Sequence, residues 1–150
     1  MSRYHALIIG CGNIGGCYDL ATDKILTYAK AFYLDSEIDF EAFDTVYEKV
    51  EKISKKYGNK IVKKINKNEL SKFDIVVISS PTETHFKYLS LCMDVEIPVI
   101  ICEKPVANKI AEIELLEKMY LKSKSNVMVN YFRNFQPKNH DIKSKVKEIS

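Results

Sequence analysis

The stretch 10–15 carries three glycines in the spacing Gly-x-Gly-x-x-Gly, only a few residues from the start of the chain. An apolar run, Ala6–Ile9, leads directly into it. This order is typical of a strand, a tight turn and a helix that together bind a dinucleotide. In this interpretation Gly10 allows the turn, Gly12 lets the backbone approach a pyrophosphate, and Gly15 lets the helix pack close to the strand.

The residues that enter the predicted helix, Asn13 and Ile14, follow directly on this turn. Their backbone N–H groups, together with the positive end of the helix dipole, are expected to hold the two phosphates. The alternative is an ordinary glycine turn between a strand and a helix, which has the same spacing.

Length and composition limit the class of protein. The chain has 150 residues, 46% apolar and 29% charged, which is typical of one globular domain. The sequence shows no apolar run long enough to span a bilayer and no export signal, so no membrane association is predicted. The net charge is only +3, and acidic and apolar residues interrupt the lysines of 49–67, so a solvated helix face is expected there rather than a nucleic-acid site.

The cysteines show no pairing or spacing suited to a metal site. They are Cys11, Cys17, Cys92 and Cys102. We therefore expect reduced thiols in a cytoplasmic protein and no bound metal. Cys11 lies in the glycine turn near a helix N-terminus, where a thiolate would be stabilised, although a small residue that simply fits the turn is the alternative.

The hydrophobic pattern alternates between strands and helices along the whole chain. It predicts strands over 4–9, 38–43, 60–65, 73–79, 97–102 and 126–131, and helices that begin near residues 14, 27, 45, 83 and 109. With the glycine turn after the first strand, this order predicts an α/β protein with a doubly wound, mostly parallel sheet of the Rossmann type, in strand order 3-2-1-4-5-6. A short amphipathic helix is expected within 133–150.

Several local features refine this plan. Residues Cys17–Leu26 are expected to form an irregular insertion. Thr45 and Glu48 match a capping box for the second long helix, and Gly58 is expected to end it. The lysines of 60–65 favour a strand toward the sheet edge. Four apolar residues are expected to form one buried stripe on the second long helix: Val46, Val50, Ile53 and Tyr57.

Asp44 ends the second predicted strand, 29 residues after Gly15. The acid that binds the adenosine ribose follows such a motif by about 20 residues, so the insertion accounts for the difference. A carboxylate there accepts both ribose hydroxyls and repels a 2′-phosphate, and no arginine follows it, which favours NAD over NADP. A helix-capping aspartate is the alternative.

The segment Ser80-Pro81-Thr82-Glu83-Thr84-His85 follows the fourth predicted strand, at the carboxyl edge of the sheet where such folds bind ligands. Thr82 is a candidate helix cap, which would put His85 in the first helical turn. A surface histidine is the alternative to a functional one.

Lys104, within Cys102–Pro105, follows the fifth strand at the same edge. A lysine there, partly shielded and near a nicotinamide, is suited to move a proton, and a cis Lys104–Pro105 bond would fix its direction. An exposed loop lysine is the alternative.

Four motifs together resemble the Gfo/Idh/MocA oxidoreductase family, which includes glucose–fructose oxidoreductase and inositol dehydrogenase. They are the glycine turn of 10–15, Ser80-Pro81-Thr82-x-x-His85, Glu103-Lys104-Pro105, and Asn130-Tyr131-x-Arg133-x-x-x-Pro137. The resemblance spans essentially the whole chain. The Glu-Lys-Pro sequence is its most specific element, since it stands in the expected order after the fifth strand.

The resemblance implies hydride transfer between a nicotinamide and a carbon that bears a sugar, nucleotide-sugar or cyclitol hydroxyl. It implies that Lys104 assists proton transfer and that Glu103 helps to seat the nicotinamide ribose. Thr82 and His85, with the adjoining Ser80 and Pro81, would line the cofactor. The insertion after the glycine turn departs from shorter family members and favours an enzyme of nucleotide-sugar or surface-polysaccharide metabolism.

Family members carry a second domain that binds substrate and supplies further catalytic residues. We therefore expect a cofactor-binding domain over 1–131 and the start of the crossover to that second domain over 132–150. Such a fragment is expected to bind NAD(H) without efficient turnover, and to self-associate through exposed apolar surface. Two alternatives remain: a non-catalytic NAD-binding or redox-sensing module, and an NAD-dependent glycoside hydrolase of the same fold.

Overall fold

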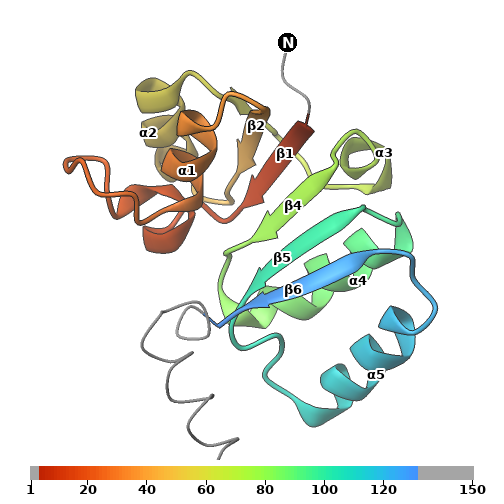
Figure 1. The fold of residues 1–150 in the computed structure, drawn as a ribbon. Coiled ribbons are helices and arrows are strands. Elements are labelled where there is room, and N and C mark those ends of the chain that lie inside the picture. The colour runs from red at the N-terminus through yellow and green to blue at the C-terminus, as the bar shows by residue number, and fades with distance from the viewer. Residues whose placement is uncertain (1–3, 132–150) are drawn as a thin grey trace, which may run out of the picture.

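The computed structural model describes residues 4–131, which form a six-stranded sheet with helices on both faces (Figure 1). All strand pairs are parallel, and the order is β3-β2-β1-β4-β5-β6, as predicted. The strands are β1 (Tyr4–Ile9), β2 (Ile38–Phe43), β3 (Lys60–Ile61), β4 (Ile75–Ile78), β5 (Val99–Glu103) and β6 (Asn126–Asn130). The helices are η1 (Asn13–Cys17), α1 (Tyr28–Leu34), α2 (Tyr47–Tyr57), α3 (Lys67–Leu70), η2 (Thr82–Thr84), α4 (His85–Asp94) and α5 (Ile110–Tyr120).

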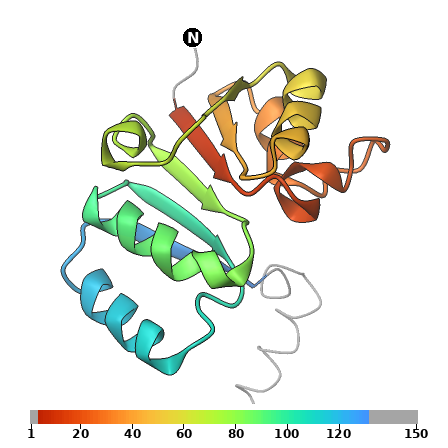
Figure 2. The ribbon, with the colours of Figure 1, turned by 180° about the vertical axis from the view of Figure 1, so that it is seen from behind.

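The two faces of the sheet bury separate cores, because successive strand side chains point to opposite sides. Leu7 and Ile9 of β1 face the side that α4 and α5 cover, whereas Ala6 and Ile8 face the side that α1 and α2 cover. Figure 2 shows α4 and α5 along the half of the sheet formed by β4, β5 and β6. The central strands β1 and β4 bury apolar residues on both faces, and this explains their nearly continuous hydrophobic runs.

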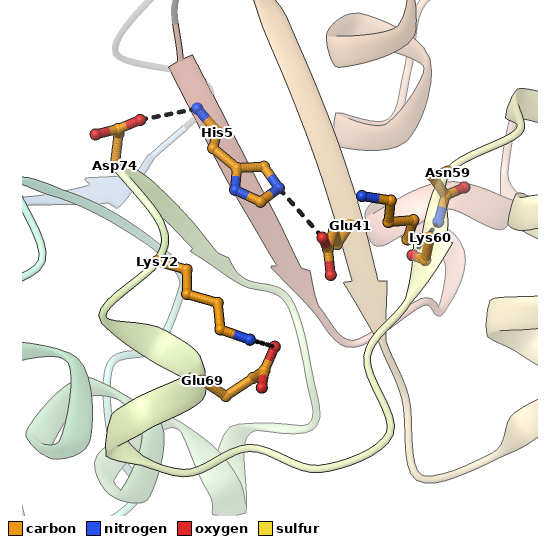
Figure 3. A network of polar contacts seen from close by, with 7 residues as sticks. All are labelled: His5, Glu41, Asn59, Lys60, Glu69, Lys72 and Asp74. Atoms are coloured by element: carbon orange, nitrogen blue, oxygen red, sulfur yellow. Dashed lines mark hydrogen bonds and ion pairs between the residues drawn. The ribbon is translucent and has the colours of Figure 1, made fainter.

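At the amino end of β1, polar contacts join neighbouring elements (Figure 3). The backbone N–H of His5 donates to Asp74 at 2.8 Å, and its ring Nε2 lies 3.3 Å from a carboxylate oxygen of Glu41 on β2. These contacts lie away from the carboxyl edge of the sheet. The glycine turn and the loops that follow β4 and β5 lie at that other edge.

The helix predicted to begin near residue 14 is a single five-residue π-helical turn, and it ends at Cys17, where the insertion was expected to begin. Two predicted helix caps are wrong. Thr45 does not cap α2, because the helix begins at Tyr47 after Val46 and no side chain caps it. Thr82 does not cap α4; it begins the short η2 turn.

Other differences are smaller. Val46 is exposed, so the buried stripe of α2 consists of Val50 and Ile53, with Tyr57 half-buried; Gly58 ends the helix in the left-handed conformation, as predicted. The third strand covers two residues, since β3 pairs only with Glu41 and Ala42. It forms the sheet edge, as predicted. The helix expected within 133–150 lies outside the described residues.

Candidate functional site

The glycine turn brings the end of β1 against the loop that follows β4. Gly10 has φ +97°, a conformation that other residues rarely adopt, and a side chain there would collide with the backbone of Ser80. The carbonyl oxygen of Gly10 accepts a hydrogen bond from Ser79 Oγ at 2.7 Å. A side chain at Gly15 would overlap that same carbonyl. The predicted roles of Gly10 and Gly15 in the turn and in close packing are therefore confirmed.

Gly12 differs from its neighbours. An added Cβ would meet no protein atom within 4 Å, so packing within the described chain does not require glycine there. Asn13 and Ile14 beside it are exposed. Backbone N–H groups in a first helical turn have no partner within the helix. The open space and these donors fit a pyrophosphate.

Gly16 has a packing role that we did not predict. A side chain at this position would overlap Ile53 of α2. The sequence signal was available, since a second glycine follows Gly15, but nothing in the local pattern indicated its distant partner.

Asp44 links the end of β2 to the glycine turn. Its Oδ2 accepts a hydrogen bond from the backbone N–H of Cys11 at 2.7 Å, and its Oδ1 accepts one from Val46 at 2.8 Å. The second bond forms a local turn ahead of α2 and explains why Thr45 is not needed as a cap. Each carboxylate oxygen keeps a further lone pair that can accept from a ribose hydroxyl.

A small cavity of about 90 Å³ joins three predicted segments. Gly10, Asp44, Ser80 and Pro81 all contribute to its lining. These residues follow three different strands. The carboxyl edge of the sheet therefore brings together the glycine turn, the acid after β2 and the loop after β4, as expected for a doubly wound fold.

The loop after β4 is held closed by hydroxyl groups. Thr84 Oγ1 lies 2.7 Å from Ser80 Oγ and donates to the carbonyl oxygen of Pro81 at 2.7 Å. We did not predict a role for Thr84. Thr82, which we expected at the cofactor, is half-buried.

His85 is only 1% exposed, so the alternative of a surface histidine is wrong. Its Nε2 lies 2.7 Å from the carbonyl oxygen of Ser80, and its Nδ1 lies 2.7 Å from that of Pro105. Both ring nitrogens are therefore engaged by backbone. The ring joins the loops that follow β4 and β5.

Glu103 ends β5, and Lys104 follows it. Glu103 is half-buried and its Oε1 accepts hydrogen bonds from Tyr28 and Asn130. Lys104 is exposed, and its Nζ has no hydrogen bond or ion pair among residues 4–131. The partial shielding that we expected for this lysine is therefore not provided by residues 4–131, where it is an exposed loop lysine. The Lys104–Pro105 bond is cis, as predicted.

The cysteines are all free, as predicted, but Cys11 is not a reactive thiolate. Burial, and secondarily the charge of Asp44, raise the pKa of Cys11 far above its ordinary value. Its Sγ lies 3.6 Å from the carbonyl oxygen of Phe43. The alternative of a small residue that fits the turn is confirmed.

Residues 4–131 contain no group of three or more His, Cys, Asp or Glu side chains that could hold a metal ion. Within the same range, no helix is long and apolar enough to cross a membrane.

Comparison with known proteins supports the interpretation of the fold. Residues 4–131 match the family described as the oxidoreductase family with an NAD-binding Rossmann fold, Gfo/Idh/MocA. A comparison with curated protein sequences finds no significant match.

Solved structures share the fold at low sequence identity. They include UDP-N-acetylglucosamine 3-dehydrogenase from Acidithiobacillus ferrooxidans (TM-score 0.78, 19% identity, 97% of this chain and 44% of that chain). A second is scyllo-inositol dehydrogenase from Lactobacillus casei with bound NAD(H) and scyllo-inositol (TM-score 0.80, 17% identity, 98% and 42%). A third is a 3-ketoreductase from Actinomadura kijaniata in complex with NADP and TDP-benzene (TM-score 0.75, 15% identity, 98% and 43%).

The chain thus spans less than half the length of each of these structures, and the match to the family covers all of the described residues. The chain belongs to the Gfo/Idh/MocA oxidoreductase family, as the part that forms its NAD-binding Rossmann domain.

Proposed function

We propose that this chain is the cofactor-binding domain of an NAD-dependent enzyme that transfers hydride between the nicotinamide and a carbon bearing a sugar, nucleotide-sugar or cyclitol hydroxyl. The observation that carries the proposal is the cavity that Gly10, Asp44 and Ser80 share, next to the open space at Gly12. A dinucleotide needs a hydroxyl acceptor and an unobstructed turn at such an edge.

Each predicted cofactor residue has a place in this proposal. Gly12, Asn13 and Ile14 would present the backbone to the pyrophosphate, and Asp44 would accept the adenosine ribose hydroxyls. The loop after β4, from Ser80 to His85, would flank the cofactor, with Pro81 and Thr82 between them. Glu103 would accept from the nicotinamide ribose.

The preference for NAD over NADP rests on charge. The Asp44 side chain lines the cavity, where its carboxylate would repel a 2′-phosphate. Solved relatives include complexes with NAD(H) and with NADP, so the fold allows either cofactor.

When bound, NAD⁺ accepts the hydride at its nicotinamide ring. Lys104, with its Nζ as the unprotonated amine, would take the hydroxyl proton of the substrate while the carbon–oxygen single bond becomes a carbonyl. The exposed position of Lys104 leaves its Nζ free to meet a substrate. Residues 132–150 would begin the crossover to a domain that binds this substrate.

Binding can be tested on residues 1–150. Isothermal titration calorimetry should detect NAD⁺ binding, and the Lys104→Ala variant should bind NAD⁺ as the wild type does. Absence of binding up to millimolar NAD⁺ would overturn the proposal. With a substrate domain present, Lys104→Ala should lose hydride transfer by about 100-fold or more at unchanged cofactor affinity.

Two outcomes would favour the alternatives in which net oxidation does not occur. Cofactor binding without turnover, together with a partner chain whose affinity is unchanged by Lys104→Ala, would point to a binding module. Cofactor that is recycled during hydrolysis of a glycoside would point to the hydrolase.

A further inference from the structure

The insertion after the glycine turn is a closed loop built around one buried carboxylate. Asp19 is 0% exposed. Its Oδ2 accepts hydrogen bonds from the backbone of Leu26 at 2.7 Å and Thr27 at 2.9 Å, and its Oδ1 accepts one from the Thr27 hydroxyl at 2.8 Å. A buried carboxylate is stable only when such donors satisfy it. The hydrogen bonds of Asp19 therefore fix where the irregular insertion predicted from sequence ends.

That point is the start of α1. Thr27 caps this helix, because its Oγ1 accepts from the backbone N–H of Lys30 at 3.2 Å. Tyr28 is consequently the first helical residue, and its direction follows from the loop closure at Asp19. We expected no role for this tyrosine from the sequence.

Tyr28 reaches across the carboxyl edge to the Glu-Lys-Pro segment. Its hydroxyl donates to Glu103 Oε1 at 2.7 Å. Asn130, at the end of β6, donates through Nδ2 to the Tyr28 hydroxyl at 2.7 Å and to Glu103 Oε1 at 2.6 Å. Three residues from three elements thus form one closed network.

The directions of these hydrogen bonds determine which donor and acceptor atoms remain available to a ligand. The hydroxyl hydrogen of Tyr28 and the amide hydrogens of Asn130 are all directed into the network. Burial, and next the bond to Glu103, raise the pKa of Tyr28, which keeps the hydroxyl protonated. Glu103 Oε2 and Asn130 Oδ1 have no partner among residues 4–131. The unused atoms are acceptors, which suit a hydroxyl and not a phosphate or carboxylate.

The network also borders a pocket that extends from the glycine turn to Tyr28 and Asn130. Tyr28 and Asn130 line an apolar pocket of about 400 Å³ together with Ile14, Tyr18 and Leu26. Ile14 belongs to the glycine turn. A ligand held at the turn can therefore extend along this pocket to Glu103.

We propose that Tyr28 is a positioning residue which, with Asn130, holds Glu103 so that its free oxygen accepts a hydroxyl of the ribose on the nicotinamide side of the cofactor. This inference rests on the proposed function. It also gives the insertion a structural role, because the loop closed by Asp19 fixes the start of α1 and with it the position of Tyr28.

The test compares ligands with and without that ribose, using residues 1–150. NAD⁺ and ADP-ribose carry it, whereas ADP does not. Tyr28→Phe should weaken NAD⁺ and ADP-ribose binding by about tenfold and leave ADP binding unchanged, because the change removes only the hydroxyl and with it the hydrogen bonds to Glu103 and Asn130. Tyr33→Phe is the matched control, since Tyr33 lies on the same helix with its side chain exposed.

A double-mutant cycle tests whether Tyr28 acts through Glu103. In a Glu103→Gln background, Tyr28→Phe should cause little further loss of NAD⁺ affinity. Asn130→Ala provides a second route to the same result if Tyr28→Phe fails to fold, as judged by circular dichroism.

The outcomes separate the two proposals. Wild-type chain that binds neither NAD⁺ nor ADP overturns the proposed function and this inference with it. Wild-type binding of NAD⁺ combined with unchanged NAD⁺ affinity in Tyr28→Phe overturns the inference alone. Equal weakening of NAD⁺ and ADP does so too, because it marks a general structural defect.

Discussion

The ring Nδ1 of His85 lies 2.7 Å from the carbonyl oxygen of Pro105, twenty residues further along the chain. Its other nitrogen meets the carbonyl of Ser80, so a single buried side chain bonds the two loops that flank the candidate site. Carbonyl oxygens only accept hydrogen bonds, and no other side chain is hydrogen-bonded to either of these two oxygens in the described structure. The position of Lys104 is therefore coupled to the loop after β4 through this ring.

His85→Ala should lower the free energy of unfolding by about 2–4 kcal/mol, because the ring contacts to two carbonyls are lost and a cavity opens. Urea denaturation measures this change. His5→Ala is the control: His5 is partly exposed and its contact with Glu41 lies at the far end of the sheet, so a loss below about 1 kcal/mol is expected. Equal losses in the two variants would contradict the linking role.

Two glycine substitutions should have opposite consequences. Gly15→Ala forces a methyl group against the Gly10 carbonyl and should destabilise the fold by about 1–3 kcal/mol. Gly12→Ala meets no protein atom, so the fold should keep its stability while NAD⁺ affinity falls at least tenfold. Thermal melting and calorimetric titration of both variants check this pair. NAD⁺ affinity that survives Gly12→Ala would argue against a pyrophosphate at the turn.

Asp44→Asn should reduce the preference for NAD⁺ over NADP⁺ by about tenfold, since the amide removes the charge that repels a 2′-phosphate. The two dissociation constants, measured at one salt concentration, give the ratio. Asp39→Asn changes an exposed carboxylate on β2, the strand that precedes Asp44, and should leave the ratio as it is. If the ratio is unchanged in Asp44→Asn, a group other than Asp44 distinguishes NAD⁺ from NADP⁺.

Stability should fall steeply in alkali because three thiols are buried. Burial raises the pKa of Cys92 to about 12 and that of Cys102 to about 12, and raises that of Cys11 further. Above pH 9 the unfolded chain loses these protons while the folded chain retains them. The stabilisation is therefore complete below pH 9 and is lost as pH rises toward the folded pKa values.

Each such thiol should contribute about 1.4 kcal/mol per pH unit to this loss. Urea denaturation at pH 8, 9 and 10 measures the slope. Cys92→Ala should make it shallower by one thiol's share, whereas an unchanged slope would show that Cys92 ionises in the folded state.

The order of strands and the motifs at their ends could be predicted from the sequence, because both depend on residues that are close together along the chain. A nearly continuous apolar run predicts a strand that is buried on both faces of a sheet. The right-handed crossovers between parallel strands then allow only a few strand orders. The glycine spacing reports backbone geometry. The positions of Gly10, Asp44 and Lys104 at one edge follow from these two facts alone.

The contacts that complete the site depended on the tertiary structure. Tyr28 and Asn130 are 102 residues apart, and nothing near either one indicates that they share Glu103. From the sequence, His85 is a single histidine on a predicted helix, and only the tertiary structure shows that its ring contacts the Pro105 carbonyl. Side-chain networks of this kind form where distant loops meet, and local periodicity carries no information on which donors and acceptors will face each other there.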